Sequence, residues 1–172
     1  MIDTDLYQKF RNLDIDSALI AFEYSEIIQP YFCYPANAKA IGFEGGVLYC
    51  FLAGYGEMVF AANPESCGDK YVYPLAASFE DFLRLILACG SANPIEQIAW
   101  MDKRQFERHL LAEKQMRTEQ QDALLARLER ELNLRPIAEP FEYVKALQAN
   151  FDDSKIQYRQ EYYDALGIEE GH

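Results

Sequence analysis

The stretch IGFEGGVLYCFLAGYGEMVFA, residues 41–61, decides the fold of this chain. Gly45-Gly46 and Gly54-Tyr55-Gly56 are tight-turn signals, because glycine adopts the backbone conformations that short turns require. The segments that follow them, residues 47–53 and 57–61, are short and dense in β-branched and aromatic residues, as buried strands are. Short strands joined by tight turns predict an antiparallel meander.

The same pattern continues toward a helix. Tyr71-Val72-Tyr73 predicts one more short strand, with its two tyrosines on the same side, and we expect Pro74 to end it. Ser78 is an N-cap signal for a helix that ends at Gly90. The residues between them are apolar around most of the helix, so we expect this helix to be sandwiched, with the sheet on one side.

The first forty residues give weaker signals. Thr4 is an N-cap candidate for a short helix. Residues 16–28 fit a helix that ends before Pro30, but residues 18–24 also fit a strand, and periodicity leaves both alternatives open. The apolar face of the short first helix consists of Leu6, Phe10 and Leu13.

A long helical tract is predicted over residues 103–134. Thr118 with Gln121 forms an internal capping-box pattern, so the tract is either one helix or two helices with a bend. Shorter helices are predicted at residues 141–147 and 155–166. Two apolar stripes run along the long tract: Phe106, Leu110 and Leu111 in its first part, and Leu124, Leu128 and Leu132 in its second part.

These elements together predict an α+β fold. We expect a small, mainly antiparallel, twisted sheet covered by helices, with a C-terminal helical extension. The length of 172 residues fits one domain, or one domain with such an extension. Residues 1–101 are predicted to form the α+β core, and residues 102–172 a helical extension that packs on this core.

The chain is strongly acidic, with 28 acidic and 16 basic residues and a net charge of -12. Residues 1–101 carry 13 acids and 5 bases, residues 102–135 carry 7 and 8, and residues 136–172 carry 8 and 3. Such a surface repels nucleic acid and anionic membranes and attracts a basic protein, although solubility alone also accounts for it. The acidic start and the shortness of the longest apolar run, residues 47–53, predict a cytoplasmic protein.

No pattern of catalytic or metal-binding residues stands out. The four cysteines have no CxxC spacing and only two histidines accompany them, so we expect free thiols, no metal and no cofactor, with Cys50 and Cys89 in the core. His109 lies in a charged tract and is interpreted as a solvated helix-face residue. The neighbouring carboxylates Glu80 and Asp81 point in different directions on a helix, which does not suit acid–base work across a cleft. We therefore do not expect an enzyme.

Aromatic residues are abundant, with 12 tyrosines and 11 phenylalanines. Tyrosine offers rigid contact area with a polar tip, which suits protein interfaces, although most of these side chains would also fit a half-buried core. Tyr55, at a turn tip, is the best surface candidate. The residues predicted to bind a partner are Glu44, Tyr55, Glu57, Glu65 and Asp69.

Residues 35–87 resemble the SUKH superfamily over about a third of the chain. The matching features are Ile41-Gly42-Phe43 before a Gly-Gly turn, Asn63-Pro64 at a loop start, and Val72-Tyr73-Pro74-Leu75-Ala76 before Ser78-Phe79-Glu80-Asp81-Phe82-Leu83. The resemblance implies a twisted, mainly antiparallel sheet covered by helices and a role as a binding module. Bacterial members are typically immunity proteins that neutralise toxins, often nucleases or deaminases, by covering their active sites.

Three functions follow as hypotheses. The first is an immunity-type binding protein whose partner is a basic protein, such as a toxin domain, with no nucleic acid or membrane partner and a monomeric or weakly homo-oligomeric state. The second is an oligomeric adaptor or regulatory scaffold that self-associates through residues 103–134, along Leu124 and Leu128. The third is an enzyme that uses carboxylates alone.

Overall fold

Four antiparallel strands, paired in chain order, form the sheet that the turn glycines predict. Gly45 and Gly54, in the first two turns, have φ angles of 56° and 97°, in the left-handed region that favours glycine. The α+β fold class and the antiparallel meander are therefore confirmed. The strands are β1 (Ala38–Glu44), β2 (Val47–Leu52), β3 (Val59–Ala62) and β4 (Val72–Ala76).

The computed structural model describes residues 5–26 and 29–170. Thr4, the predicted N-cap, and residues 27–28 lie outside the described residues. Within them, the helices are α1 (Asp5–Asn12), η1 (Ser17–Ile20), α2 (Phe79–Cys89), α3 (Ala92–Gln97), η2 (Ile98–Trp100), α4 (Lys103–Met116), α5 (Glu119–Glu131), α6 (Pro140–Ala149) and α7 (Gln160–Leu166).

Aromatic rings fill the layer between the sheet and α2. The ring of Phe22 lies 5.3 Å from that of Phe82 and 5.7 Å from that of Tyr49, measured between centroids, and all three side chains are buried. Edge-to-face pairs of this kind add to the hydrophobic stabilisation that burial provides. The same cluster includes helical side chains from beyond residue 101, namely Phe106, Leu124, Leu128 and Val144.

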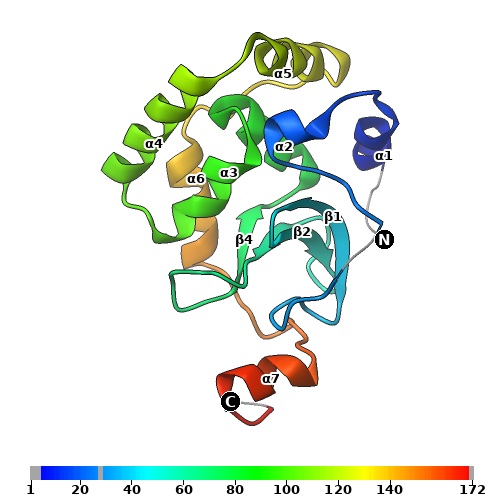
Figure 1. The fold of residues 1–172 in the computed structure, drawn as a ribbon, viewed down its shortest axis with the longest axis vertical. Coiled ribbons are helices and arrows are strands. Elements are labelled where there is room, and N and C mark those ends of the chain that lie inside the picture. The colour runs from blue at the N-terminus through cyan, green and yellow to red at the C-terminus, as the bar shows by residue number, and fades with distance from the viewer. Residues whose placement is uncertain (1–4, 27–28, 171–172) are drawn as a thin grey trace.

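The other face of the sheet is covered by irregular chain. We call residues 151–159 the C-terminal strap, which passes along the side of the sheet opposite α4 and α5 before α7 (Figure 1). Phe151, Ile156 and Tyr158 of the strap pack against a second cluster that includes Cys50 and Phe60. The strap is also held by its backbone, since Ala36 N donates to Gln157 O at 2.6 Å.

The tract 16–28 is neither the helix nor the strand that the sequence allowed. Its described part forms the short helix η1, capped by the Asp16 side chain, which accepts from Ala18 N. Ala21 then has a φ of 54°, which ends the helix because a left-handed residue cannot continue it. Glu23 follows with a single antiparallel bridge to Phe43.

The prediction that Pro74 ends the last strand is wrong. Pro74 lies inside β4, opposite Phe60, and β4 is an edge strand. The Pro74 carbonyl accepts a hydrogen bond from Gln148 Nε2 of α6 at 3.0 Å, so the backbone polar atoms of Pro74 point away from β3. The N–H that proline lacks therefore does not remove a hydrogen bond between β3 and β4. The tyrosine prediction is also wrong, because Tyr71 precedes the strand and contacts Phe32, whereas Tyr73 contacts Trp100.

The helical tract 103–134 is two helices. Thr118 caps α5, with its hydroxyl accepting from Gln121 N at 3.1 Å, so the alternative with a bend is confirmed. The last helix begins at Gln160 rather than at residue 155. Lys155 and Gln157 instead hydrogen-bond to the side chain of Asn37, and these contacts hold the strap in a non-helical conformation.

Candidate functional site

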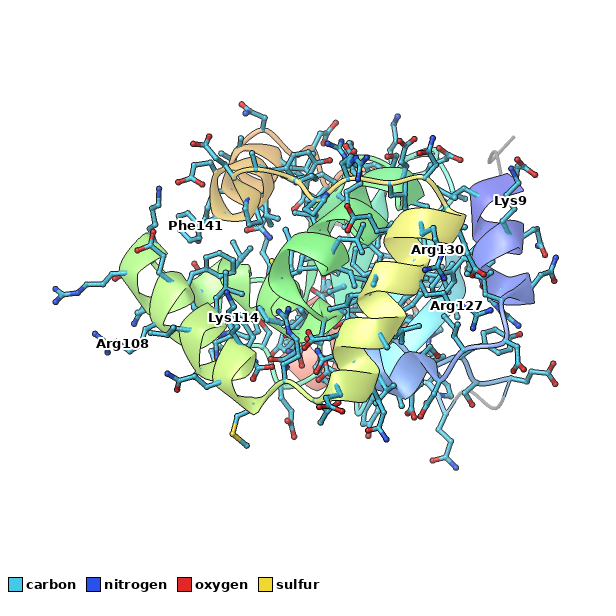
Figure 2. The ribbon with its side chains drawn as sticks, turned by 90° about the horizontal axis from the view of Figure 1, so that it is seen from above. Lys9, Arg108, Lys114, Arg127, Arg130 and Phe141 are labelled. Atoms are coloured by element: carbon cyan, nitrogen blue, oxygen red, sulfur yellow. The ribbon has the colours of Figure 1, made fainter. Side chains whose placement is uncertain are left out.

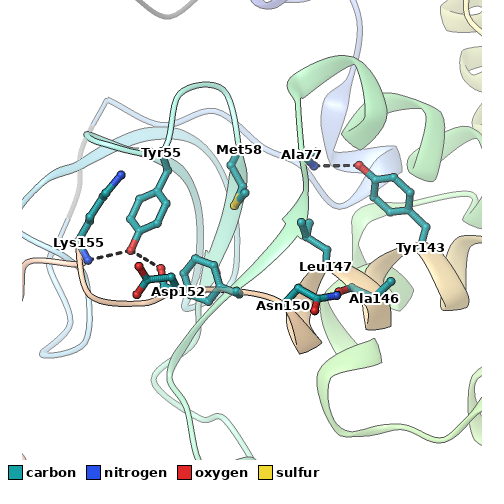
Figure 3. Close-up of a pocket in the computed structure, with 10 residues that line it drawn as sticks. Tyr55, Met58, Ala77, Tyr143, Ala146, Leu147, Asn150, Asp152 and Lys155 are labelled. Atoms are coloured by element: carbon teal, nitrogen blue, oxygen red, sulfur yellow. Dashed lines mark hydrogen bonds between the residues drawn. The ribbon is translucent and has the colours of Figure 1, made fainter.

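Two hollows that share Phe151 in their lining form a concave surface among the described residues. We call them together the Phe151 groove. The first has a volume of ≈ 580 Å³ and the second of ≈ 240 Å³. The first is lined chiefly by Tyr55, Met58, Tyr143, Leu147 and Phe151 (Figure 3), and the second by Ser66, Asp69, Lys70, Gln148 and Phe151.

Helix α6 forms one wall of the groove. Val144 anchors the helix in the core with no exposed surface, and the bond from Gln148 to Pro74 holds it along the β4 edge. The Tyr143 hydroxyl donates to Asp81 Oδ2 at 2.7 Å and accepts from Ala77 N at 2.9 Å. Burial raises the pKa of the Tyr143 phenol, so the phenol stays neutral. Its hydroxyl group makes both of these hydrogen bonds within the protein.

Tyr55 forms the opposite wall and is not the free turn-tip anchor that the sequence suggested. Its hydroxyl donates to Asp152 O at 2.8 Å and accepts from Lys155 N at 3.0 Å. Its ring lies 5.1 Å from Phe60 and 5.5 Å from Phe151. Tyr55 therefore holds the strap against the β2–β3 turn and contributes only part of its ring to the groove.

The rim of the groove carries charges of both signs, with Asp152 and Lys155 at the first hollow and Asp69 and Lys70 at the second. Asp152 and Asp153 are exposed on the strap, and Asp69 is exposed on the β3–β4 loop. A hydrogen bond from Ser154 N lowers the pKa of Asp152, so this carboxylate is ionised at neutral pH. Asp153 pairs with Lys70 at 3.1 Å, with both side chains 57% exposed, and such a pair exchanges readily for another partner.

The structure places two of the five predicted partner-binding residues in the lining of this groove. Tyr55 and Asp69 line it, and Glu57 lies in the turn between Tyr55 and Met58. Glu65 is exposed on the β3–β4 loop and does not line either hollow. Its backbone N–H donates to Asn63 Oδ1 at 2.9 Å.

Glu44, the fifth predicted residue, belongs to a polar network at the opposite end of the sheet. Its carboxylate accepts from Asn93 Nδ2 at 3.1 Å and from the Tyr49 hydroxyl at 3.3 Å. Burial raises the pKa of Glu44. His109 Nε2 lies 3.2 Å from Asn93 Oδ1, so this half-buried histidine joins the network instead of being a solvated helix-face residue.

Sequence reasoning missed Phe151, Met58 and Leu147. Phe151 follows the predicted helix 141–147 without any turn or strand signal of its own. Its role comes from a contact across the chain, because its ring lies 5.4 Å from that of Phe60. The excess of aromatic residues near the C-terminus was the only available signal, and it did not locate the groove.

A second buried carboxylate, Glu96, ties α3 to the sheet. Its side chain is 3% exposed, and it accepts hydrogen bonds from the Tyr73 hydroxyl and from Asn63 Nδ2, the latter at 2.8 Å. Burial raises the pKa of Glu96 above its ordinary value of 4.5, and the two hydrogen bonds oppose that shift. The folded protein therefore holds this proton to a higher pH than the unfolded chain does.

This difference predicts a pH-dependent stability. The contribution of Glu96 is fully present below pH 4.5 and is lost as the pH rises through the raised pKa, because the unfolded carboxyl gives up its proton first. Relative to a Glu96→Gln variant, the wild-type free energy of unfolding should fall as the pH rises from 4.5 toward neutrality. Urea denaturation across this range measures it, with Glu65→Gln as an exposed control. Parallel curves for wild type and Glu96→Gln would contradict the assignment.

The tie between Tyr55 and the strap gives another prediction. Tyr55→Phe removes the acceptor for the Lys155 amide and the donor to Asp152 O, so the Lys155 amide should exchange with solvent about fivefold faster. Hydrogen exchange followed by NMR measures this rate residue by residue. Tyr31→Phe, at a tyrosine that is 48% exposed, serves as the control and should leave Lys155 unchanged. Equal exchange in all three proteins would show that the Tyr55 hydroxyl does not hold the strap.

Other kinds of site receive no support from the described residues. No group of three or more His, Cys, Asp or Glu side chains there is arranged to hold a metal ion. The cysteines are free, with Cys33, Cys50 and Cys89 buried and Cys67 exposed. Over the same ranges, no helix is long and apolar enough to cross a membrane.

The fold and the groove define an α+β protein with an open antiparallel sheet and an apolar surface groove that has a charged rim. No protein-family model matches the chain, and comparisons with curated proteins and with solved structures gave no match either.

Proposed function

We propose that this chain is a protein-binding module of the immunity type, which binds a basic toxin domain and covers its active site. The observation that carries the proposal is the Phe151 groove, an apolar hollow of ≈ 580 Å³ with exposed charged side chains at its edge, in a chain of net charge -12. Central apolar contact surrounded by polar residues is the arrangement in which protein interfaces concentrate their binding energy.

Charge supports a basic partner. The net charge is -12, and the acidic excess lies outside residues 102–135, which carry 7 acids and 8 bases. Figure 2 shows part of that balanced region, with Arg108 and Lys114 on α4 and Arg127 and Arg130 on α5. The groove lies on the acidic remainder of the molecule, where long-range attraction accelerates association with a cationic surface.

The resemblance to the SUKH superfamily supports the toxin class. A nuclease or a nucleic-acid deaminase must bind a polyanion, so its active-site surface is basic. An acidic module that covers such a surface blocks the substrate both sterically and electrostatically. The chain's own residues would act through shape and charge, with Met58 and Leu147 in contact with the partner and Asp69 and Asp152 at the rim.

Affinity capture from the cells that produce the chain tests this function. Wild type should retain one basic protein at low salt and lose it at high salt, because rim ion pairs are screened. Leu147→Glu, at the half-buried groove wall, should lose the same protein. Leu111→Glu, at a 59% exposed position on α4, is the matched control and should keep it.

The captured protein then decides the toxin assignment. Expressed alone it should arrest growth, and co-expression of the wild-type chain should restore growth, whereas co-expression of Leu147→Glu should not. A captured protein without toxicity would retain the binding function and overturn the immunity role. Capture of no protein at all at low salt would overturn both.

Self-association along residues 103–134 receives no comparable support. Leu124 and Leu128, the stripe on which that hypothesis depended, are 6% and 1% exposed and lie in the core of the same molecule. They are therefore not available to a second copy while the chain is folded.

A further inference from the structure

The two hollows of the Phe151 groove differ in chemistry, and this difference defines what the groove recognises. The first is walled by Tyr55, Met58, Tyr143 and Leu147. The hydroxyls of Tyr55 and Tyr143 are already hydrogen-bonded within the protein. The walls formed by these four residues therefore offer apolar surface without free hydrogen-bonding groups, and their complement is an apolar side chain.

The second hollow offers hydrogen-bond acceptors. Asp69 and Gln148 line it, and the Asp69 carboxylate forms no ion pair with the described residues. Ser66 is already used, because its hydroxyl donates to Lys70 O at 2.7 Å. A lysine or arginine side chain supplies the donors that an exposed aspartate and an amide oxygen accept.

The strap adds a second acidic position to the groove. Asp152 lines the first hollow, and its carboxylate is exposed and ionised. Lys155 lines the same hollow and its charge helps to lower the pKa of Asp152. Lys155 Nζ also donates to Gly54 O at 3.3 Å, and Lys70 pairs with Asp153. One exposed carboxylate thus lines each of the two hollows.

We infer that the groove recognises a short basic segment of its partner, in which one large apolar residue is flanked by lysine or arginine. This inference rests on the proposed function and adds the chemistry of the partner's binding element. The apolar residue enters the hollow between Met58 and Leu147, and the flanking cations pair with Asp69 and Asp152. Because both hollows share Phe151, the apolar residue and the cation lie within about two residues of each other in an extended segment.

Peptide titration of the ¹⁵N-labelled full chain, followed by NMR, tests the inference. Three acetylated and amidated pentapeptides are the probes: Gly-Lys-Phe-Lys-Gly, Gly-Glu-Phe-Glu-Gly and Gly-Lys-Gly-Lys-Gly. The first should shift the amide signals of Met58, Leu147 and Phe151 and bind roughly fivefold more tightly than the second at low salt. The third should bind more weakly than the first, because it lacks the apolar residue.

A double variant separates charge from shape. Asp69→Asn with Asp152→Asn keeps the size of both side chains and should reduce the preference for the lysine peptide over the glutamate peptide to about onefold. Equal binding of these two peptides to wild type, shifts confined to α4 and α5, or no binding of any peptide would overturn the inference. The capture experiment tests the proposed function separately. If a basic partner is captured but the peptides show no such preference, the proposed function is retained and only the inferred recognition of a basic segment is contradicted.

Discussion

Phe22→Ala should destabilise the protein by about 3–5 kcal/mol, the usual cost of removing a fully buried phenylalanine ring. Phe22 is 1% exposed, and its ring contacts those of Phe10, Tyr49 and Phe82. The surrounding groups belong to the sheet, α1 and α2, so they cannot collapse together into the space left by the ring. Guanidinium denaturation of the wild type and the variant measures the loss.

Gly42 makes this prediction sharper, because it faces the same ring. A Cβ atom at Gly42 would lie 2.3 Å from Phe22 Cε2, which is far inside van der Waals contact. Gly42→Ala alone should therefore cost about 1–3 kcal/mol through overpacking. In the Phe22→Ala background the methyl group has room, so the added cost of Gly42→Ala should disappear. Additive losses in this double-mutant cycle would show that the two residues do not contact each other.

Leu128→Glu should destabilise the protein by about 3–5 kcal/mol, because it places a charge in the core without a partner. Leu128 is 1% exposed, and α5 packs against η1. Leu111→Glu makes the same change at a 59% exposed position on α4 and should alter stability by less than about 0.5 kcal/mol.

The same pair of variants tests self-association. If residues 103–134 formed the seam of an oligomer, Leu128→Glu would leave a folded monomer of unchanged stability. We instead expect loss of the folded state, seen as a lower denaturation midpoint together with a weaker near-ultraviolet circular dichroism signal. A folded, dissociated Leu128→Glu protein in light scattering would contradict the placement of α5 in the core.

Much of the fold was predictable because local chemistry determines it. Gly45 and Gly54 specify tight turns, and Ser78 caps α2 with a hydrogen bond from Asp81 N at 3.1 Å. Thr118 likewise marks the start of α5. In each case the residue type and its near neighbours suffice, so the tertiary structure agrees with the sequence pattern.

The failures involve contacts between distant segments. Lys155 and Gln157 have a helical pattern around them, yet Asn37 bonds to both and keeps the strap irregular. Pro74 is compatible with β4 only because the strand lies at the edge of the sheet and α6 covers it. Neither partner can be read from the local sequence, because each lies far along the chain.

The sequence predicted which kinds of residue form the candidate site, but it located only some of those residues correctly. Acidic and tyrosine-bearing turns pointed to the region of Tyr55, Glu57 and Asp69, and of these residues Tyr55 and Asp69 line the groove. Glu44 instead stabilises a buried network with Asn93. The residue at the centre, Phe151, acquires its role from packing on Phe60, and no periodic pattern signals such a contact.

The shape of the groove depends on whether the strap stays in place. Phe151, Asp152 and Lys155 form one side of it, and they stay in place through contacts with Tyr55 and Asn37. Loss of these contacts would remove a wall of the groove and uncover the second apolar face of the sheet at once. Stability of the strap and affinity for a partner should therefore change together.

Site-specific photo-crosslinking tests the central claim most directly. A photoreactive phenylalanine analogue replaces Met58 in the groove, and a second protein carries it at Leu111 on α4. After irradiation in extracts of the producing cells at low salt, the Met58 protein should become covalently linked to one basic protein, and the Leu111 protein should not. The same products at both positions, or none at Met58, would contradict a groove that binds a basic partner.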